Sequence, residues 1–168
     1  MPRSSQELLR VLAVTGTRQP FAVTVHNWPP DWSWPHADCE RILVVLSAGR
    51  NPAPALRVAL AALSREALCV SVAVVGPSYT PDWLCVDTSV SFRIEEIREE
   101  TFRLAAEHVP DHVAFRLIDT PGWHGVRTDL RKYPQDLVIC SVSRWSVLAV
   151  PSLTMSDAPV MVLRDPHP

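Results

Sequence analysis

Apolar and polar residues follow two different periods along this chain, and the period changes several times after residue 40. Ile42–Leu46 is an unbroken run of β-branched residues and leucine, which is typical of a strand buried on both faces. The apolar residues between Pro52 and Leu63 then recur at the spacing of one helix face. Asn51 can cap that helix, and Pro52 suits its first turn, where no N–H partner is lost. These segments predict a buried strand followed by a helix.

The same alternation continues to the end of the chain. Further strands are predicted over Cys69–Val75, His112–Ile118, Leu137–Ser141 and Val160–Leu163. Further helices are predicted over Arg93–His108 and a kinked segment that contains Pro151, Pro121–Tyr133 is predicted as a short helix or a turn, and Ser78–Ser91 is predicted as a loop. Glu99 and Arg103 are spaced for an ion pair across one helical turn. Strands separated by helices imply right-handed crossovers. We therefore expect an α/β fold with a doubly wound, five-stranded parallel sheet and helices on both faces.

Residues 1–40 have another pattern and form an N-terminal extension to an α/β domain over residues 41–168. Ser4 and Glu7 form a capping box ahead of apolar residues that end at Leu12, which predicts a short helix. Phe21–His26 alternates like a half-buried strand. Trp28–Trp34 holds three tryptophans, which are costly to leave in water. We expect this segment either to pack on its own domain or to contact a protein partner.

The charge balance of the chain and the length of its apolar runs limit the kinds of partner that we expect. The chain has 168 residues, with 16 basic and 18 acidic residues and no basic stripe, so we expect no nucleic-acid partner. Asp31, Asp38 and Glu40 flank the tryptophans and would repel phosphate. No apolar run reaches the roughly 18 residues that span a bilayer, and Met1–Arg10 is too polar for a secretory leader. We expect a cytoplasmic protein without a membrane partner.

Candidate catalytic groups are sparse. The four cysteines are widely spaced, which favours buried free thiols over zinc or redox chemistry. The six histidines give no H-E-x-x-H motif, and no G-x-S-x-G elbow is present. His36, Asp38 and Cys39 are three possible metal donors on one segment, and Asp119 with His124 could belong to a triad, but neither spacing is specific. We expect no enzymatic activity and no metal, with a small α/β enzyme kept as an alternative.

Five segments, in this order, resemble the universal stress protein family over about residues 40–165. They are Arg41–Val45, the helix Pro52–Leu63, the acidic helix Glu95–Glu107, Gln135–Ile139 and Ala158–Arg164. ATP-binding members of that family carry an acidic residue at the end of the first strand. They also carry a G-x-x-G-x9-G-[S/T] loop after the fourth strand.

This chain departs from the family at both positions. Ser47 or Ala48 occupies the acidic position, and the connector Val142–Ala158 contains no glycine. Gly122 and Gly125 form a G-x-x-G, but they precede the fourth strand. Phosphates are held by main-chain N–H groups at close approach, which glycine permits. We therefore expect no ATP and no other cofactor.

A ligand could still occupy the crevice beyond the carboxyl ends of the strands, where the strand order reverses. The resemblance places that point between the first and fourth strands. Serine and arginine side chains beside a helix N-terminus can hold an anion, and they can equally cap helices or be solvated. The candidate ligand-binding residues are Ser47, Gly49, Arg50, Asn51, Ser141, Ser143 and Arg144.

The last strand predicts an assembly. Its apolar residues would form an edge with unpaired main-chain groups, and members of the family often pair there across a two-fold axis. We expect a homodimer through Val160, Met161, Val162 and Leu163.

Two functions follow as hypotheses. In the first, the chain is a module similar to universal stress proteins that does not bind ATP and acts through dimerisation or a protein partner in a stress or regulatory response. In the second, it is a nucleotide- or anion-binding regulator that uses the loops after strands one and four. The missing glycines favour the first hypothesis.

Overall fold

The fold is taken from a computed structural model of the chain. The structure describes residues 10–12, 21–32, 38–47, 51–75, 88–118, 122–141 and 157–164. Trp34, His36, Cys85 and the predicted kinked helix around Pro151 lie outside these ranges.

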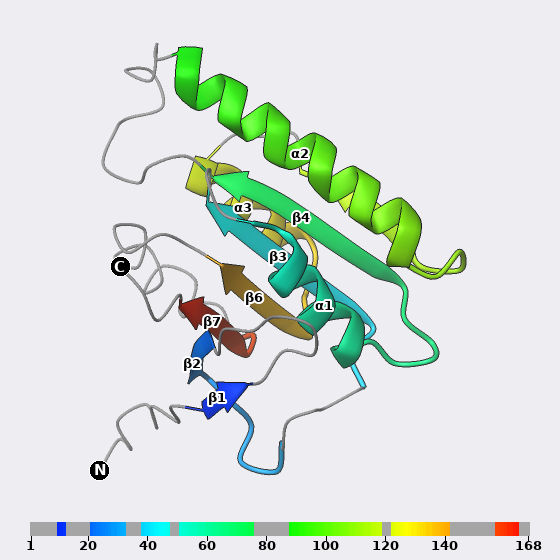
Figure 1. The fold of residues 1–168 in the computed structure, drawn as a ribbon. Coiled ribbons are helices and arrows are strands. Elements are labelled where there is room, and N and C mark those ends of the chain that lie inside the picture. The colour runs from blue at the N-terminus through cyan, green and yellow to red at the C-terminus, as the bar shows by residue number, and fades with distance from the viewer. Residues whose placement is uncertain are drawn as a thin grey trace.

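A seven-stranded, mostly parallel sheet forms the centre of the molecule, with the strand order β1-β2-β7-β6-β3-β4-β5 (Figure 1). Its five parallel strands are β3 (Arg41–Ser47), β4 (Cys69–Val75), β5 (Ala114–Leu117), β6 (Leu137–Ser141) and β7 (Val160–Arg164). Four of these strands were predicted from their apolar runs and β5 from a partial alternation over His112–Ile118, and the α/β class is confirmed. The sheet is larger than the predicted one because the N-terminal extension adds two strands.

The N-terminal strands are β1 (Arg10–Leu12) and β2 (Phe21–His26), and they run antiparallel to their neighbours. β2 confirms the strand predicted from alternation. The helix predicted from the capping box is wrong over Arg10–Leu12, because these residues pair with β2. A three-residue segment satisfies its main-chain groups more fully beside an existing strand than in an isolated short helix.

The expectation that Val160–Leu163 forms an edge is also wrong. β7 pairs with β6 on one side and with β2 on the other, so Val160, Met161, Val162 and Leu163 are interior to the sheet. All four are at most 2% exposed. Their main-chain groups are therefore not free to pair with a second copy while β2 is in place.

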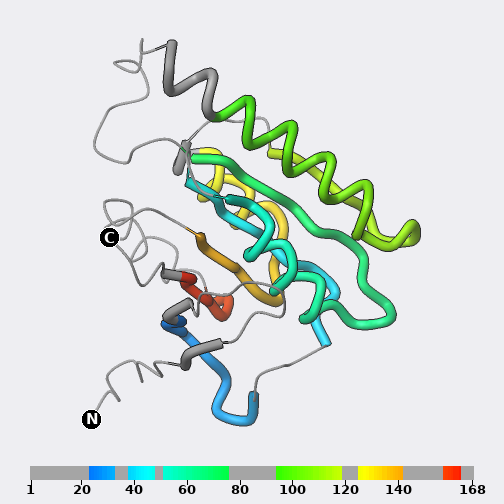
Figure 2. The backbone as a smooth tube through the Cα atoms, viewed as in Figure 1, coloured from blue at the N-terminus to red at the C-terminus, as the bar shows by residue number. Residues whose placement is uncertain are grey.

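In the part of the chain that the structure describes, three helices cover the two faces of the sheet: α1 (Ala53–Ala62), α2 (Thr88–His108) and α3 (Gly122–Lys132). Alternate strand residues point to opposite faces. Ile42, Val44 and Val70 belong to the core that includes residues of α1 and α2. Leu43 and Val45 belong to the core beneath Val126 of α3. Figures 1 and 2 show α3 behind the sheet and the other two helices in front.

The helix α2 starts at Thr88, so the predicted loop Ser78–Ser91 ends earlier than expected. Arg103 pairs with Glu100 and Glu107, at 2.7 and 2.8 Å, in place of the predicted Glu99. Both pairs lie on the exposed face of the helix, where they contribute little to stability.

Among the described residues, no helix combines the length and the apolar character that crossing a membrane requires.

Candidate functional site

The predicted crevice at the carboxyl ends of the strands is described in part. Ser141 on β6 pairs with Leu46 on β3, next to Ser47, so the structure brings the two serines to neighbouring strand ends. Both serines are buried, with 3% of Ser47 and 6% of Ser141 exposed. Asn51 Oδ1 accepts a hydrogen bond from the Ala53 N–H at 3.0 Å, but the N-cap residue of α1 is Pro52 and not Asn51 as predicted. The other four candidates, Gly49, Arg50, Ser143 and Arg144, lie outside the described residues.

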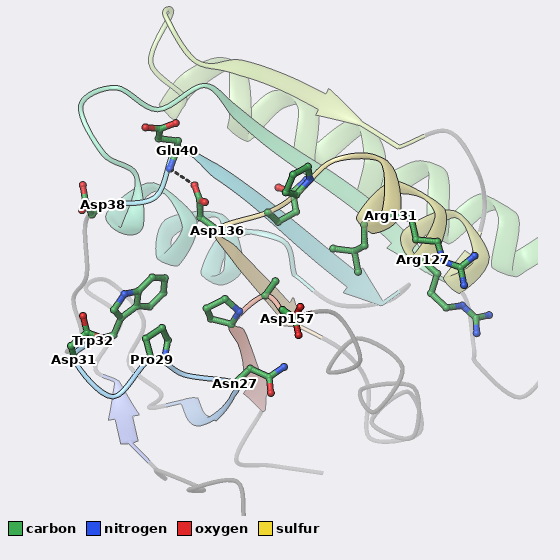
Figure 3. A pocket seen from close by; sticks show the side chains of 15 residues that line it. Asn27, Pro29, Asp31, Trp32, Asp38, Glu40, Arg127, Arg131, Asp136 and Asp157 are labelled. Atoms are coloured by element: carbon green, nitrogen blue, oxygen red, sulfur yellow. Dashed lines mark hydrogen bonds between the residues drawn. The ribbon is translucent and has the colours of Figure 1, made fainter.

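A wide hollow opens at the opposite end of the sheet, where β3, β6 and β7 begin (Figure 3). Its volume is about 1230 Å³. Segments from four parts of the chain border it: the turn after β2, the residues before β3, the residues around the end of α3 and the start of β6, and the residues before β7. It is large enough for a ligand or for several residues of a partner.

Asp136 fixes the floor of this hollow. Its Oδ2 accepts hydrogen bonds from the main-chain N–H of Glu40 at 2.8 Å and of Arg41 at 3.0 Å, and the Asp136 N–H donates to the Arg41 carbonyl. Hydrogen bonds to an ionised group are stronger than neutral ones. The carboxylate therefore holds the starts of β3 and β6 together, although about 95 residues separate them in the sequence.

Trp32 forms part of one wall of the hollow, and Trp28 packs against it. Trp28 and Trp32 meet edge to face with ring centroids 5.2 Å apart, and the Trp28 Nε1–H donates to the Trp32 carbonyl at 3.2 Å. Both side chains pack against the core beneath α1 and α2. Packing on the own domain, one of the two roles expected for this segment, is thus observed for Trp28 and Trp32. Asn27, with φ of 52°, turns the chain from β2 into this wall.

Charge is separated across the hollow. Asp31, Asp38 and Glu40 lie on the tryptophan side, while Arg127 and Arg131 of α3 lie on the opposite side, with Asp157 between them (Figure 3). Over the described part of the chain, no ion pair joins these arginines to the carboxylates. The potential at one wall is therefore negative and at the other positive.

The buried thiols of Cys39 and Cys140 are poor nucleophiles. Burial raises the pKa of the Cys39 thiol to about 11, with the carboxylates of Asp136 and Asp38 contributing in the same direction. Burial raises the pKa of the Cys140 thiol to about 12. Since the thiolate is the reactive form, neither group is suited to covalent chemistry near neutral pH. Cys39, Cys69 and Cys140 are free, as predicted.

A second polar cluster lies under α3. Arg116 on β5 donates to both carboxylate oxygens of Asp129, at 2.8 and 3.0 Å, and to Ser71 Oγ at 3.1 Å. Its guanidinium carbon lies 4.8 Å from the centre of the Tyr133 ring. The Asp129 carboxylate and the Ser71 hydroxyl both accept from Arg116, so the cluster anchors α3 to the sheet.

The hollow was not predicted from the sequence because the residues that line it come from separate turns of the chain. One signal was present in the sequence: acidic residues close to the tryptophans, which served only to disfavour phosphate. The described residues contain no group of three or more histidine, cysteine or carboxylate side chains able to hold a metal ion. His36, one of the three possible donors, lies outside them.

Comparison with protein-family models, with curated proteins and with solved structures found no match for this chain.

Proposed function

We propose that the chain is a divergent relative of the universal stress proteins that binds no ATP and acts through a protein partner or through dimerisation in a stress or regulatory response. The observation that carries the proposal is the pairing of β3 with β6 at the centre of five parallel strands. It agrees with the resemblance, which makes the first and fourth strands neighbours. The segment that follows β6 contains no glycine before residue 168, and so lacks the residues that let a main chain wrap phosphates.

Thermal unfolding with and without ATP, ADP and cyclic nucleotides at millimolar concentration tests this proposal. A nucleotide present at 100 times its Kd would stabilise the folded protein by about 2.7 kcal/mol, which raises the Tm of a domain of this size by several degrees. We expect no shift with any of them. A shift with ATP would contradict the proposal.

The second candidate is an anion-binding regulator, and the juxtaposition of Ser47 and Ser141 beside the start of α1 favours it. Inorganic phosphate should then raise the Tm of the wild type, and Arg50→Ala and Arg144→Ala should each reduce that shift. An equal shift in the wild type and in both variants would exclude these residues from the site.

Dimerisation belongs to the first proposal, but it requires a surface other than β7, which is already paired on both sides. Sedimentation velocity at micromolar concentration should show a species of twice the chain mass. A species of single mass would leave partner binding as the mode of action.

A cytoplasmic location is supported by the free thiols of Cys39, Cys69 and Cys140.

A further inference from the structure

We propose that the hollow at the amino ends of β3, β6 and β7 is a docking site for a segment of a partner protein that carries arginine or lysine. This inference rests on the proposed partner-binding function and names the chemistry of the partner. It depends on three observations: the volume of the hollow, the distribution of charge around it and the aromatic wall.

The negative wall selects a cation. Asp31, Asp38 and Glu40 on this wall, and Asp157 between the two walls, are exposed side chains that border the hollow, and none forms an ion pair within the described part of the chain. Asp136 differs from them, because its carboxylate already accepts two main-chain N–H groups. A ligand cation can therefore approach four carboxylates without first breaking an internal ion pair.

The aromatic wall adds a preference for guanidinium. Trp32 borders the hollow beside Asp31. A cation within about 6 Å of an indole face is attracted to the ring, and arginine also stacks on aromatic rings and bonds carboxylates through two N–H groups. We expect an arginine-bearing segment to bind more tightly than a lysine-bearing one.

The opposite wall fixes where the cation goes. Arg127 and Arg131 lie one helical turn apart on α3 and point away from the tryptophan side (Figure 3). They repel a cationic group and confine it to the negative wall. A nucleotide is disfavoured at that wall because its phosphates would meet the carboxylates of Asp31, Asp38 and Glu40. The described carboxylates are also too dispersed to form a metal site.

A segment of a protein suits the dimensions better than a single small cation. The hollow holds about 1230 Å³, more than the roughly 300–1000 Å³ typical of small-molecule sites. Its carboxylates are spread over the turn after β2, the residues before β3 and the residue before Ala158. Several cationic side chains on one peptide can reach these positions together.

The test uses the full chain and three capped hexapeptides, made of arginine, lysine or glutamate. Binding is measured by isothermal titration calorimetry at low and at physiological salt. The Trp32 indole N–H resonance reports the location of the peptide. We expect the arginine peptide to bind, the lysine peptide to bind more weakly and the glutamate peptide not to bind.

Two variants with the same change in charge identify the site. Asp31→Asn, Asp38→Asn and Glu40→Gln together remove three carboxylates from the hollow while keeping the main-chain contacts of residue 40. Glu95→Gln, Glu96→Gln and Glu99→Gln together remove three exposed carboxylates from α2. The first triple variant should bind the arginine peptide roughly tenfold more weakly, and the second should bind within about twofold of the wild type.

Several outcomes would overturn the inference: no binding of the arginine peptide, equal binding of the glutamate peptide, an equal loss in both triple variants, or binding that leaves the Trp32 resonance unmoved. These results are separate from the nucleotide melts. A failure of peptide binding with no nucleotide shift rejects the docking site alone, whereas a shift with ATP rejects the proposed function.

Discussion

The two edges of the parallel strands are protected in different ways. At one edge β7, whose residues are almost all apolar, is covered by five residues of β2 in register. At the other edge β5 has no described strand beyond it, yet it has only four residues, with none fully buried. β5 also carries Arg116. The Arg98 side chain donates a hydrogen bond to the carbonyl of Ile118, the residue directly after β5, at 3.4 Å. Short strands and charged side chains are the usual protection of an exposed edge.

The comparison of the two edges explains why the prediction that β7 is an edge strand was wrong. A strand whose residues are apolar on both faces is typical of a sheet interior. The composition of Val160–Leu163 therefore indicated that another segment would lie beside it, and the alternating segment Phe21–His26 was available for that position. The mixed composition of β5 was the better sign of an edge.

The largest expected effect comes from introducing a charge at the covered edge. Val23 on β2 is 2% exposed, and Val23→Asp buries an uncompensated carboxylate, at a cost of about 4 kcal/mol of unfolding free energy. Ala114→Asp, at an exposed position of β5, is the matched control and should change stability by less than about 0.5 kcal/mol. Urea denaturation of both variants measures the difference. Equal losses would mean that the two edges are equally buried.

The second effect concerns the anchor of the open edge. Arg116→Ala leaves the Asp129 carboxylate, which is 7% exposed, without its donor. We expect a loss of about 3 kcal/mol, and Asp129→Asn, which keeps an acceptor and removes the charge, should cost less. Chemical denaturation gives both values. A loss below about 1 kcal/mol for Arg116→Ala would show that the ion pair does not hold α3 in place.

Two buried thiols between the edges, that of Cys39 just before β3 and that of Cys140 on β6, make the stability of the fold depend on pH. The pKa values of Cys39 and Cys140 are raised from 9.0 to about 11 and about 12, so above pH 9 the unfolded chain loses these protons before the folded chain does. Stability is therefore retained below pH 9 and falls as pH rises beyond it, by about 1 kcal/mol per thiol between pH 8 and pH 10. Denaturation midpoints at the two pH values measure this loss. Cys140→Ala should have a smaller pH dependence than the wild type, and an unchanged dependence would contradict the assignment.

The smallest effect is expected at the aromatic pair over β5. Phe102 on α2 is 60% exposed and meets Phe115 edge to face, with centroids 6.2 Å apart. Phe102→Ser should cost roughly 0.5–1 kcal/mol, as measured by thermal unfolding. If the same substitution also changed the sedimentation coefficient at micromolar concentration, this edge and not β7 would carry the assembly.

Prediction from sequence succeeded where one local pattern decides the structure. The continuous apolar runs defined β3, β4, β6 and β7, a partial alternation defined β5, and the spacing of residues such as Ile97 and Ala105 defined the buried face of α2. The prediction for the segment ending at Leu12 failed because so short a segment is compatible with a helix or a strand, and only the presence of β2 decides between them. The hollow could not be predicted because Asp31, Asp136 and Asp157 meet only after the strand order is set.

The pairing of β2 with β7 has a consequence for synthesis on the ribosome. One of the earliest strands to emerge must wait for the last, since His26 finds its partner only when Val160 has left the exit tunnel. Until then β2 is available to chaperones or to neighbouring nascent chains, and the sheet closes on this side only when β2 and β7 meet. A second copy of Phe21–His26 appended after residue 168 would compete with β2 for pairing with β7.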